Sequence, residues 1–426
     1  MLAQRLRPLL LSTVILGLLI SACSCREEED EQTIGNSVST NQDTATHDTT
    51  LLPPVETKPP NTSYPPAFEG QTRVAGMQTQ AQITVTEFAS GLNNPWGMAN
   101  LPDGRILITE KGGNLRIVDQ SGVVSSAIGG LPPVNSAGQG GLLDVAVHPD
   151  FNSNRLIYWT FSQNGTNGTA TAVAKGQLSI NESNVVNVQL IYTALPEFNG
   201  TAHYGSRMVW DANDNLFIST GERSSASIRA EAQELDAALG KILRIDTNGN
   251  AVSGNPFISQ TNALDAIYSY GHRNPQGMDI HPQTGELWAI EHGPRGGDEV
   301  NLVESGKNYG WPVISYGIEY GGAAVGAGLT QQPGMEQPIY YWDPSIAPCG
   351  ATFYSGSLIS EWTNNLFVTA LAGQHLVRLA IQGNRVVGEE RLLESVARFR
   401  DVLEGTDGAL YVIESGNNAK MHRIAR

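Results

Sequence analysis

Residues 268–312 read YSYGHRNPQGMDIHPQTGELWAIEHGPRGGDEVNLVESGKNYGWP and contain two strand patterns among polar, glycine-rich turns. Residues 277–281 and 287–291 are short and rich in apolar side chains, and Gln283-Thr284-Gly285 between them is typical of a tight turn. The segment therefore predicts a β-hairpin. GHRNP (residues 271–275) and GPRGGDE (residues 293–299) stand at its open end, so their polar groups are expected side by side.

The loop at residues 293–299 offers oxygen ligands for a hard cation. Gly293-Pro294 presents carbonyls, and Asp298 and Glu299 follow with carboxylates; calcium prefers such ligands. The alternative is a solvated loop closed by an Arg-Asp ion pair. The residues of the loop leave both interpretations open.

The hairpin pattern recurs along the chain. A short apolar strand, a polar turn and a second apolar strand occur six times, at residues 96–110, 144–161, 207–220, 277–291, 350–370 and 399–414. Repeated antiparallel units with DG, NDN and TG turns predict an all-β, six-bladed β-propeller. A β-sandwich or a pair of β-domains is the alternative, and it fits six spaced hairpins less well.

The sixth unit lacks strands. After Glu414, only residues 421–425 can serve as its third strand, whereas QITVTEFA (residues 82–89) precedes the first unit and has no blade of its own. We therefore expect the N-terminal strand to close the ring in the last blade.

The first 80 residues predict export and anchoring. Arg5, Arg7 and the apolar run at residues 9–20 are typical of a signal peptide at residues 1–22, and ISAC ends in Cys23 as a bacterial lipobox does. An ordinary cleavage site is the alternative. Residues 23–80 are acidic and then Pro-rich with few large apolar side chains, which predicts a lipidated, disordered tether before a domain at residues 81–426. The absence of Asp after Cys23 favours the outer membrane, facing the periplasm or the cell surface.

Composition excludes one class of partner. The chain has 42 acidic and 26 basic residues, a net charge of −16, which argues against nucleic acid as a ligand. Two of its three Cys lie at the processing site, so the domain has no internal disulfide. The sequence leaves a monomer and a homodimer equally open.

Three basic side chains stand out. Arg398 and Arg400 are two apart on a predicted strand, so both project to one face and call for an anion such as a carboxylate or phosphate. An ion pair with Asp401 or Glu404 is the alternative. His203, in the segment NGTAHYGSRM before a predicted strand, is placed as a general base could be.

Five motifs together resemble one family. GQGGLLDVAVHPDF (138–151), AHYGSRM, GHRNPQGMDIHP, EHGPRGGDE with KNYGWP, and RFRDV are similar to the soluble aldose sugar dehydrogenases that use pyrroloquinoline quinone, which are six-bladed propellers related to soluble glucose dehydrogenase. The resemblance covers residues 84–426. It implies oxidation of an aldose sugar at the anomeric carbon to a lactone, with hydride passing to the quinone and electrons to an unidentified acceptor.

The resemblance also assigns roles to residues. It implies that His203 is the base, that Glu222 in STGER orients it, and that Arg273 belongs to both the catalytic and the cofactor-binding groups. The further cofactor contacts that it implies are Gln139, Asn274, Arg398, Arg400 and Trp342, the last as a cover for the ring. The calcium ligands that it implies are the carbonyls of Gly293 and Pro294 at the cofactor, with Glu299, the Tyr309 carbonyl and nearby Asp298 at a second, structural calcium.

Two positions depart from the family pattern. A cofactor-binding Lys is expected near Ala372, but TALAGQHL contains none, and Ala202 stands before His203 where the glucose enzymes have an acidic residue. A propeller without cofactor, acting as a cell-surface binding module, is therefore the competing function. A calcium-assisted lactonase would need more carboxylates at the channel mouth than the sequence offers.

Overall fold

The computed structural model describes residues 52–356 and 358–426, and their regular secondary structure is almost entirely β-strand. The described helices are short: α1 (Phe151–Asn154) and two 3-10 turns, η1 (Arg229–Ala232) and η2 (Ser360–Trp362). Within these residues, no helix is long and apolar enough to cross a bilayer.

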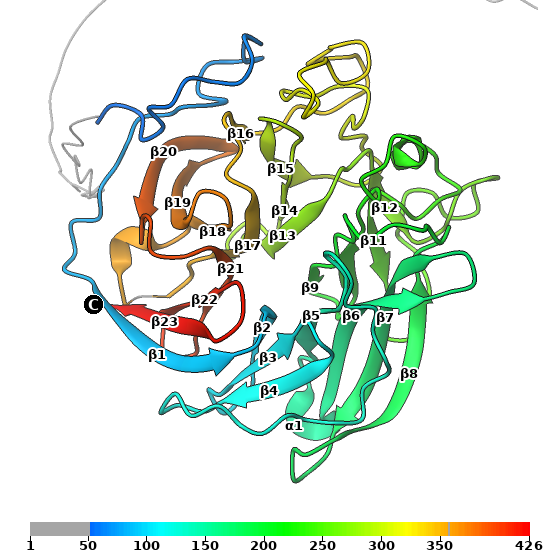
Figure 1. The fold of residues 1–426 in the computed structure, drawn as a ribbon, viewed down its shortest axis with the longest axis vertical. Coiled ribbons are helices and arrows are strands. Elements are labelled where there is room, and N and C mark those ends of the chain that lie inside the picture. The colour runs from blue at the N-terminus through cyan, green and yellow to red at the C-terminus, as the bar shows by residue number, and fades with distance from the viewer. Residues whose placement is uncertain (1–51, 357) are drawn as a thin grey trace, which may run out of the picture. The chain divides into compact units, whose positions relative to one another are not determined.

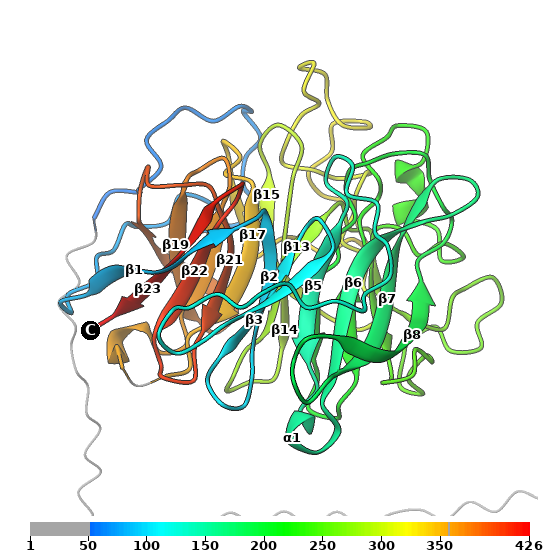
Figure 2. The same cartoon turned by 60° about the horizontal axis from the view of Figure 1, so that its bottom comes forward.

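Six antiparallel sheets form a ring (Figures 1 and 2). The first sheet contains β2 (Pro95–Asn100), β3 (Ile106–Glu110) and β4 (Asn114–Val118). The second contains β5 (Leu142–Val147), β6 (Leu156–Asn164), β7 (Thr169–Leu178) and β8 (Val185–Thr193). The third contains β9 (Met208–Trp210), β10 (Leu216–Ser219), β11 (Lys241–Ile245) and β12 (Ile267–Tyr270).

The other three sheets continue the ring with four strands each. The fourth contains β13 (Pro275–Ile280), β14 (Leu287–Glu291), β15 (Asp298–Val303) and β16 (Tyr340–Trp342). The fifth contains β17 (Pro348–Phe353), β18 (Leu366–Ala370), β19 (His375–Gln382) and β20 (Arg385–Leu392). The sixth contains β21 (Phe399–Glu404), β22 (Leu410–Glu414), β23 (Ala419–Ala425) and β1 (Thr84–Leu92).

Each predicted hairpin is the inner pair of strands of one sheet, so the six-bladed propeller is confirmed. The hairpin at residues 277–291 is formed by β13 and β14, with Ile280 opposite Leu287 across the turn. Gly285 in that turn has φ +72°, a conformation that strongly favours glycine.

The last sheet joins the two ends of the propeller. β1 pairs antiparallel with β23, with Thr84 opposite Ala425 and Val85 opposite Ile424. The strand that the sequence analysis places in the last blade is thus its outermost strand. The first and last strands of the propeller therefore lie side by side in one sheet (Figure 1).

Residues 52–80 pack against the propeller, so the prediction of a disordered tether is wrong for this segment. The Met77 amide donates to the Glu389 carbonyl on β20, and the Glu389 amide donates to Ala75. Asp343 accepts hydrogen bonds from Asn61 and Thr62. The segment uses the open outer edge of β20 and buried carboxylates, which offset its ordering entropy without a large apolar surface. The remainder of the predicted tether, the signal peptide and Cys23 lie outside the described residues.

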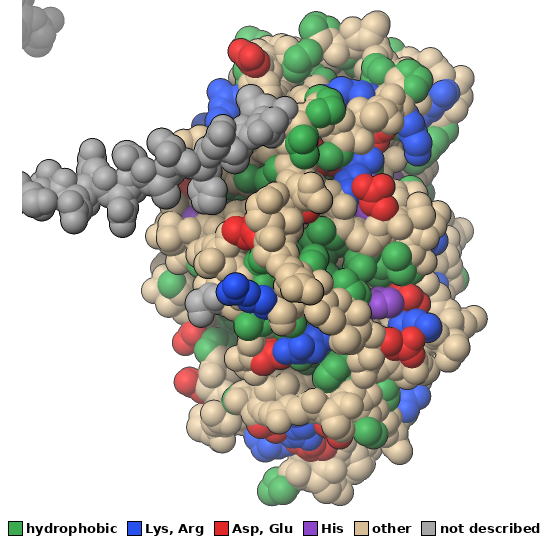
Figure 3. All heavy atoms as spheres, turned by 90° about the vertical axis from the view of Figure 1, so that its left-hand side faces the viewer, with side chains coloured by type: hydrophobic (Ala, Val, Ile, Leu, Met, Phe, Trp, Pro, Cys, Tyr) green, Lys and Arg blue, Asp and Glu red, His purple; other side chains and the backbone are tan. Residues whose placement is uncertain are grey.

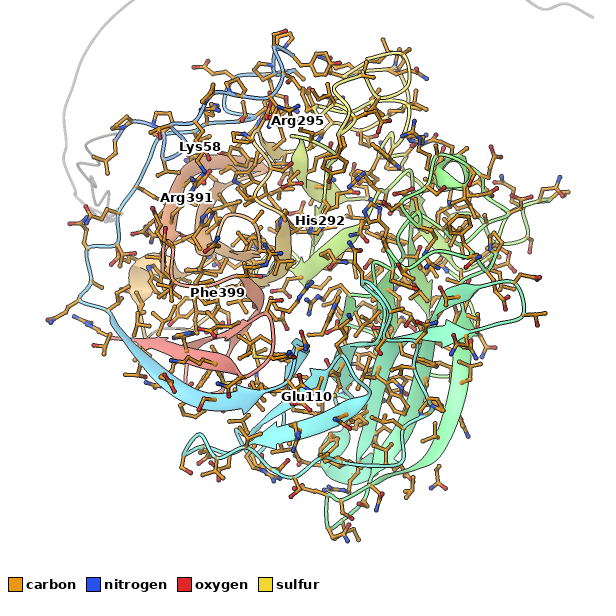
Figure 4. All side chains as sticks on the ribbon, in the orientation of Figure 1. Lys58, Glu110, His292, Arg295, Arg391 and Phe399 are labelled. Atoms are coloured by element: carbon orange, nitrogen blue, oxygen red, sulfur yellow. The ribbon has the colours of Figure 1, made fainter. Side chains whose placement is uncertain are left out.

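Figure 3 shows the side of the molecule that lies on the left in Figure 1, where basic, acidic and apolar side chains are intermingled. Figure 4 places Lys58, Arg391 and Arg295 on the outer part of the ring, where this segment crosses, and His292 near the middle.

Apolar side chains fill the space between neighbouring sheets. Trp288 and Ile290 of the fourth sheet, for example, pack with Val368 and Val377 of the fifth. The inner strands β2, β5, β9, β13, β17 and β21 contact one another in this order around the ring, so their first residues converge.

Charged groups tie four of the sheets together at the centre. Buried Arg207 lies 3.0 Å from Asp144 (Nη1 to Oδ1) and 3.1 Å from Asp401 (Nη2 to Oδ1). The same two carboxylates accept hydrogen bonds from the Met208 and Met98 amides. Inner strands of the first, second, third and sixth sheets are therefore cross-linked by one ionic network.

Candidate active site

A cavity of about 250 Å³ lies where the inner strands begin. Gln139 precedes β5, Tyr204 and Gly205 precede β9, and Gln276 and Arg400 stand near the starts of β13 and β21. The starts converge because the inner strands are neighbours around the ring. Polar loop residues from several sheets therefore face one space.

The cavity carries positive charge. Lys111, Arg398 and Arg400 line it, and no Asp or Glu is among its lining residues. Arg400 donates from Nη1 to Gln276 Oε1 at 3.2 Å, and its guanidinium lies 5.8 Å from the Trp96 ring centre. A space lined by unpaired cations is suited to an anionic ligand.

The expected alternative partners of these arginines are engaged elsewhere. Asp401 forms an ion pair with Arg207, and Glu404 accepts hydrogen bonds from the Ser355 amide and hydroxyl. Among the described residues, no carboxylate lies within ion-pair distance of Arg398 or Arg400. The structure therefore favours the anion-binding interpretation over the ion pair.

His203 and Glu222 form a buried pair. His203 Nδ1 lies 2.5 Å from Glu222 Oε1, and the two side chains are 7% and 1% exposed. A carboxylate accepts, so Nδ1 carries the proton and Nε2 of the neutral ring keeps its lone pair. Burial lowers the pKa of His203 below 6.5, although the hydrogen bond that it donates to Glu222 opposes that shift. His203 is thus neutral and basic at Nε2 at physiological pH.

The backbone around this pair is fixed by other predicted site residues. The His203 amide donates to Gln139 Oε1 at 2.8 Å, and the Glu222 amide donates to the Arg273 carbonyl at 2.9 Å. Asn274 Oδ1 accepts from the Gly205 amide at 3.1 Å. His203 has φ +49°, a left-handed conformation that is unusual for histidine and is held by these contacts. The structure therefore brings five predicted residues together.

The loop at residues 293–299 is closely tied to Arg273. Arg273 donates from Nη1 to the carbonyl of Gly293 at 2.5 Å, and the Pro294 carbonyl accepts from the Ser345 hydroxyl at 3.2 Å. A cation at the Gly293 carbonyl would replace the guanidinium as its partner. Arg273 Nε is buried without a hydrogen-bond partner in the described structure, so this side chain is not fully satisfied where it lies.

Asp298 has a structural role in this loop. Its Oδ1 accepts from the Gly293 amide, and its Oδ2 accepts from the Ile346 and Ala347 amides, each at 2.8 Å. Burial raises its pKa to about 6. The ion pair within the loop is not formed, because Asp298 binds amides and Arg295 donates to Asn61.

Glu299 and Tyr309 line a second, very small cavity of about 10 Å³ together with Glu291. Burial and the nearby Glu291 raise the pKa of Glu299 well above its ordinary value. Asn301 Nδ2 donates to both glutamates, at 2.9 and 3.2 Å. A buried carboxylate, Glu291, and a half-buried one, Glu299, around a space of roughly one ion are suited to a hard cation. No cluster of three or more His, Cys, Asp or Glu side chains suited to a metal occurs in residues 52–356 and 358–426.

Trp342 does not line the main cavity. Its indole is 2% exposed and packs in the apolar core between the fourth and fifth sheets. Strand β16, which carries it, is the outermost strand of its sheet, so its side chains meet the neighbouring sheet and not the channel. The prediction that Trp342 covers a ring bound in the cavity is therefore not supported; Trp96 and Tyr204 are aromatic residues that do line it.

Comparison with known proteins identifies the family of the chain. A family model described as glucose/sorbosone dehydrogenase matches residues 92–423. The chain belongs to this family. One relative is the aldose sugar dehydrogenase YliI of Escherichia coli (strain K12). It is 38% identical to this chain over 349 residues, which are 81% of this chain and 93% of the relative.

Solved structures of family members have the same fold. A crystal structure of glucose dehydrogenase is 40% identical with TM-score 0.77, and covers 80% of this chain and 99% of that one. The PQQ-bound aldose sugar dehydrogenase from Streptomyces coelicolor is 26% identical with TM-score 0.67, and covers 82% of this chain and 99% of that one. Sequence similarity and structural similarity therefore both support the six-bladed propeller. Both also support the assignment to the sugar dehydrogenases, which are oxidoreductases.

One position that recurs from sheet to sheet contributes cavity residues that the sequence motifs did not indicate. The residue directly after the second strand of a sheet lines the cavity in four sheets: Lys111 after β3, His292 after β14, Leu371 after β18 and Ser415 after β22. Burial lowers the pKa of His292 to about 3, so this ring is neutral. Aligning the six hairpins on their second strands is the signal that could have found these residues.

Proposed function

We propose that this protein is a quinoprotein that oxidises aldose sugars at the anomeric carbon to lactones, with pyrroloquinoline quinone and calcium as cofactors. The observation that carries the proposal is the cation-lined cavity beside a buried His203-Glu222 pair. The cavity supplies anion binding, and the pair supplies a base. The PQQ-bound structure of the Streptomyces coelicolor relative supports the same cofactor.

The residues present fit such a cofactor, which is a tricarboxylate. Arg398 and Arg400 line the cavity without carboxylate partners and would bind cofactor carboxylates. Bound there, the quinone would supply the acceptor for the hydride that leaves the sugar.

His203 is the proposed general base. Its Nε2 would take the proton of the anomeric hydroxyl, and Glu222 would hold the imidazole in the required tautomer and stabilise its protonated form. Gln139 would keep His203 in place through the hydrogen bond to its amide. In this scheme the chain moves one proton, and hydride transfer occurs in the same step.

Calcium is proposed at two places. The Gly293 and Pro294 carbonyls would bind one ion beside the cofactor, and Glu299 with the Tyr309 carbonyl would bind a structural one. The small cavity lined by Glu299 and Glu291 supports the second position, because two carboxylates face one space there and no ion pair joins either of them to Arg273, which also lines it.

We also propose that Cys23 is lipidated and that the protein is exported and anchored at the outer membrane, in the periplasm or at the cell surface. The support is the lipobox-like ISAC sequence after an apolar run. The acceptor of the electrons and a monomeric or homodimeric state are outside this proposal.

Reconstitution tests the proposed activity. Apoprotein is titrated with pyrroloquinoline quinone, with and without calcium, and then assayed on a panel of aldoses with a dye as electron acceptor. We expect calcium-dependent binding and dye reduction, reversed by chelation. His203→Ala should lower turnover by about 100-fold or more while quinone binding persists. Absence of calcium-dependent quinone binding up to about millimolar concentration would favour a binding module, the competing function that the missing Lys near Ala372 suggests.

A further inference from the structure

We infer that Lys111 binds a carboxylate of the cofactor and replaces the lysine that is missing near Ala372. This inference rests on the proposed function and assigns one more residue of the same site. Lys111 follows β3 in the first sheet and lines the cavity together with Arg398 and Arg400.

The backbone of Lys111 is held on both sides. Its amide donates to the Asn94 carbonyl at 2.9 Å, and its carbonyl accepts from the Leu142 amide at 3.0 Å. These contacts join the first sheet to the start of β5. The side chain therefore starts from a backbone that is held in place. It lines the cavity, and its Nζ donates to the Gly138 carbonyl at 2.6 Å.

The ammonium lies in an environment that calls for an anion. Partial burial, and then the nearby positive charge of Arg400, lower the pKa of Lys111. Its hydrogen-bond acceptor in the structure is a neutral carbonyl, and no carboxylate lies within ion-pair distance of it among the described residues. A ligand carboxylate would relieve the repulsion from Arg400 and satisfy the remaining N–H groups of the ammonium.

The propeller symmetry relates Lys111 to the segment in which the lysine is missing. Lys111 and Leu371 occupy the same position in their sheets, directly after the second strand, and both line the cavity. Leu371 and the adjacent Ala372 offer no charge, so the fifth sheet presents an apolar wall. The first sheet supplies a positive charge to the cavity from the corresponding position.

Lys111 adds a third positive charge to those of Arg398 and Arg400 among the residues that line the cavity. Without Lys111, a carboxylate in this space would have one fewer partner, and leaving a charged group without its hydrogen-bond partner weakens binding.

The test compares quinone affinity of four variants by calorimetry, with calcium present. Lys111→Met and Lys111→Gln should bind pyrroloquinoline quinone about tenfold or more weakly than wild type, whereas Lys111→Arg should stay within about threefold. Lys175→Met is the matched control, because Lys175 also donates its ammonium to a main-chain carbonyl, that of Thr247 at 2.9 Å, but does not line the cavity. It should bind like wild type.

Lys111→Gln separates the two roles of this side chain. Glutamine keeps a donor for the Gly138 carbonyl but has no charge, so normal binding by Lys111→Gln would assign Lys111 to holding Gly138 and overturn the inference. The loss in Lys111→Met should shrink at high salt, because exposed charges are screened. Ala372→Lys in the Lys111→Met background should restore part of the affinity.

Failure of the proposed function is distinguishable. Wild-type protein that binds no quinone overturns the proposed function and this inference with it. Wild-type binding that Lys111→Met leaves unchanged overturns this inference alone. Thermal unfolding of each variant, followed by circular dichroism, identifies a change in affinity that comes from a change in folding.

Discussion

Glu222→Gln should impair the general base His203 and leave the cofactor-binding cavity intact. Glu222 Oε1 accepts from His203 Nδ1 at 2.5 Å and from the Ser224 amide at 3.1 Å, while its Oε2 is buried without a hydrogen-bond partner in the described structure. A glutamine of nearly the same shape fills this space. Because Nδ1 and the Ser224 amide both donate to Oε1, the carbonyl oxygen of glutamine takes that place and the imidazole keeps its tautomer. The variant therefore loses the negative charge that stabilises the imidazole once it has accepted the substrate proton.

The expected loss can be bounded. General base catalysis contributes roughly 10² to 10⁴ in rate, and an Asp-to-Asn change in a Ser-His-Asp triad, which also reverses the tautomer, costs about 10⁴ and gives the upper bound. We therefore expect Glu222→Gln to lower turnover by about 10² to 10⁴, or about 3 to 5 kcal/mol of activation free energy. Quinone affinity should change little, because Glu222 does not line the cavity.

The pH profile provides a second readout. The base must be neutral, so activity is lost as the pH falls through the pKa of His203, which burial places below 6.5. The hydrogen bond to the Glu222 carboxylate and its negative charge raise that pKa, so loss of the charge should move the acidic limb to still lower pH. Any residual activity of the variant should therefore persist further into acid than that of wild type.

The assay is dye reduction by reconstituted enzyme across pH, with quinone affinity measured on the same samples. Glu414→Gln is the control, because Glu414 also pairs with a histidine, His422, at 2.8 Å, but does not line the cavity. Turnover of Glu222→Gln within about threefold of wild type, or an acidic limb displaced to higher pH, would refute the assignment of His203 and Glu222.

Three further changes test other parts of the molecule. Arg207→Met leaves two buried carboxylates without their cation and should lower the free energy of unfolding by about 3 to 5 kcal/mol in urea denaturation, so an unchanged midpoint would contradict the central network. Asp343→Asn weakens the hold on residues 52–80 and should speed trypsin cleavage after Arg73 by about tenfold, whereas equal rates would show that other contacts retain the segment. Cys23→Ser should release the protein from the membrane fraction, and a variant that stays bound has no lipid anchor at this residue.

The sequence was most informative where local pattern decides structure. Each strand pair has the same sequence pattern: an apolar run, a polar turn and a second apolar run. All six pairs form in the expected order. His203, Glu222 and Arg273 were found because each lies in a distinctive motif. Their contacts follow from the convergence of the inner strands.

Tertiary context decided what the sequence did not reveal. Residues 52–80 have a composition typical of disorder, yet they bind the open edge of β20 and the carboxylate of Asp343. No local sequence pattern predicts these contacts. Trp342 has the chemistry of a ring-covering residue but lies on an outermost strand. Lys111 belongs to a distant hairpin, so its approach to Arg400 depends on the closure of the ring.

The pairing of β1 with β23 determines when the molecule can become complete during its synthesis. The ribosome makes β1 before any blade and β23 after all of them, so the sixth sheet waits for the end of translation. Until then β1 and β22 each present an unpaired edge, the kind of surface that recruits other strands or proteases. Pairing between the ends of a chain also slows folding. A nascent chain stalled before β23 is therefore expected to be a substrate for degradation, whereas the finished chain protects both edges in a single step.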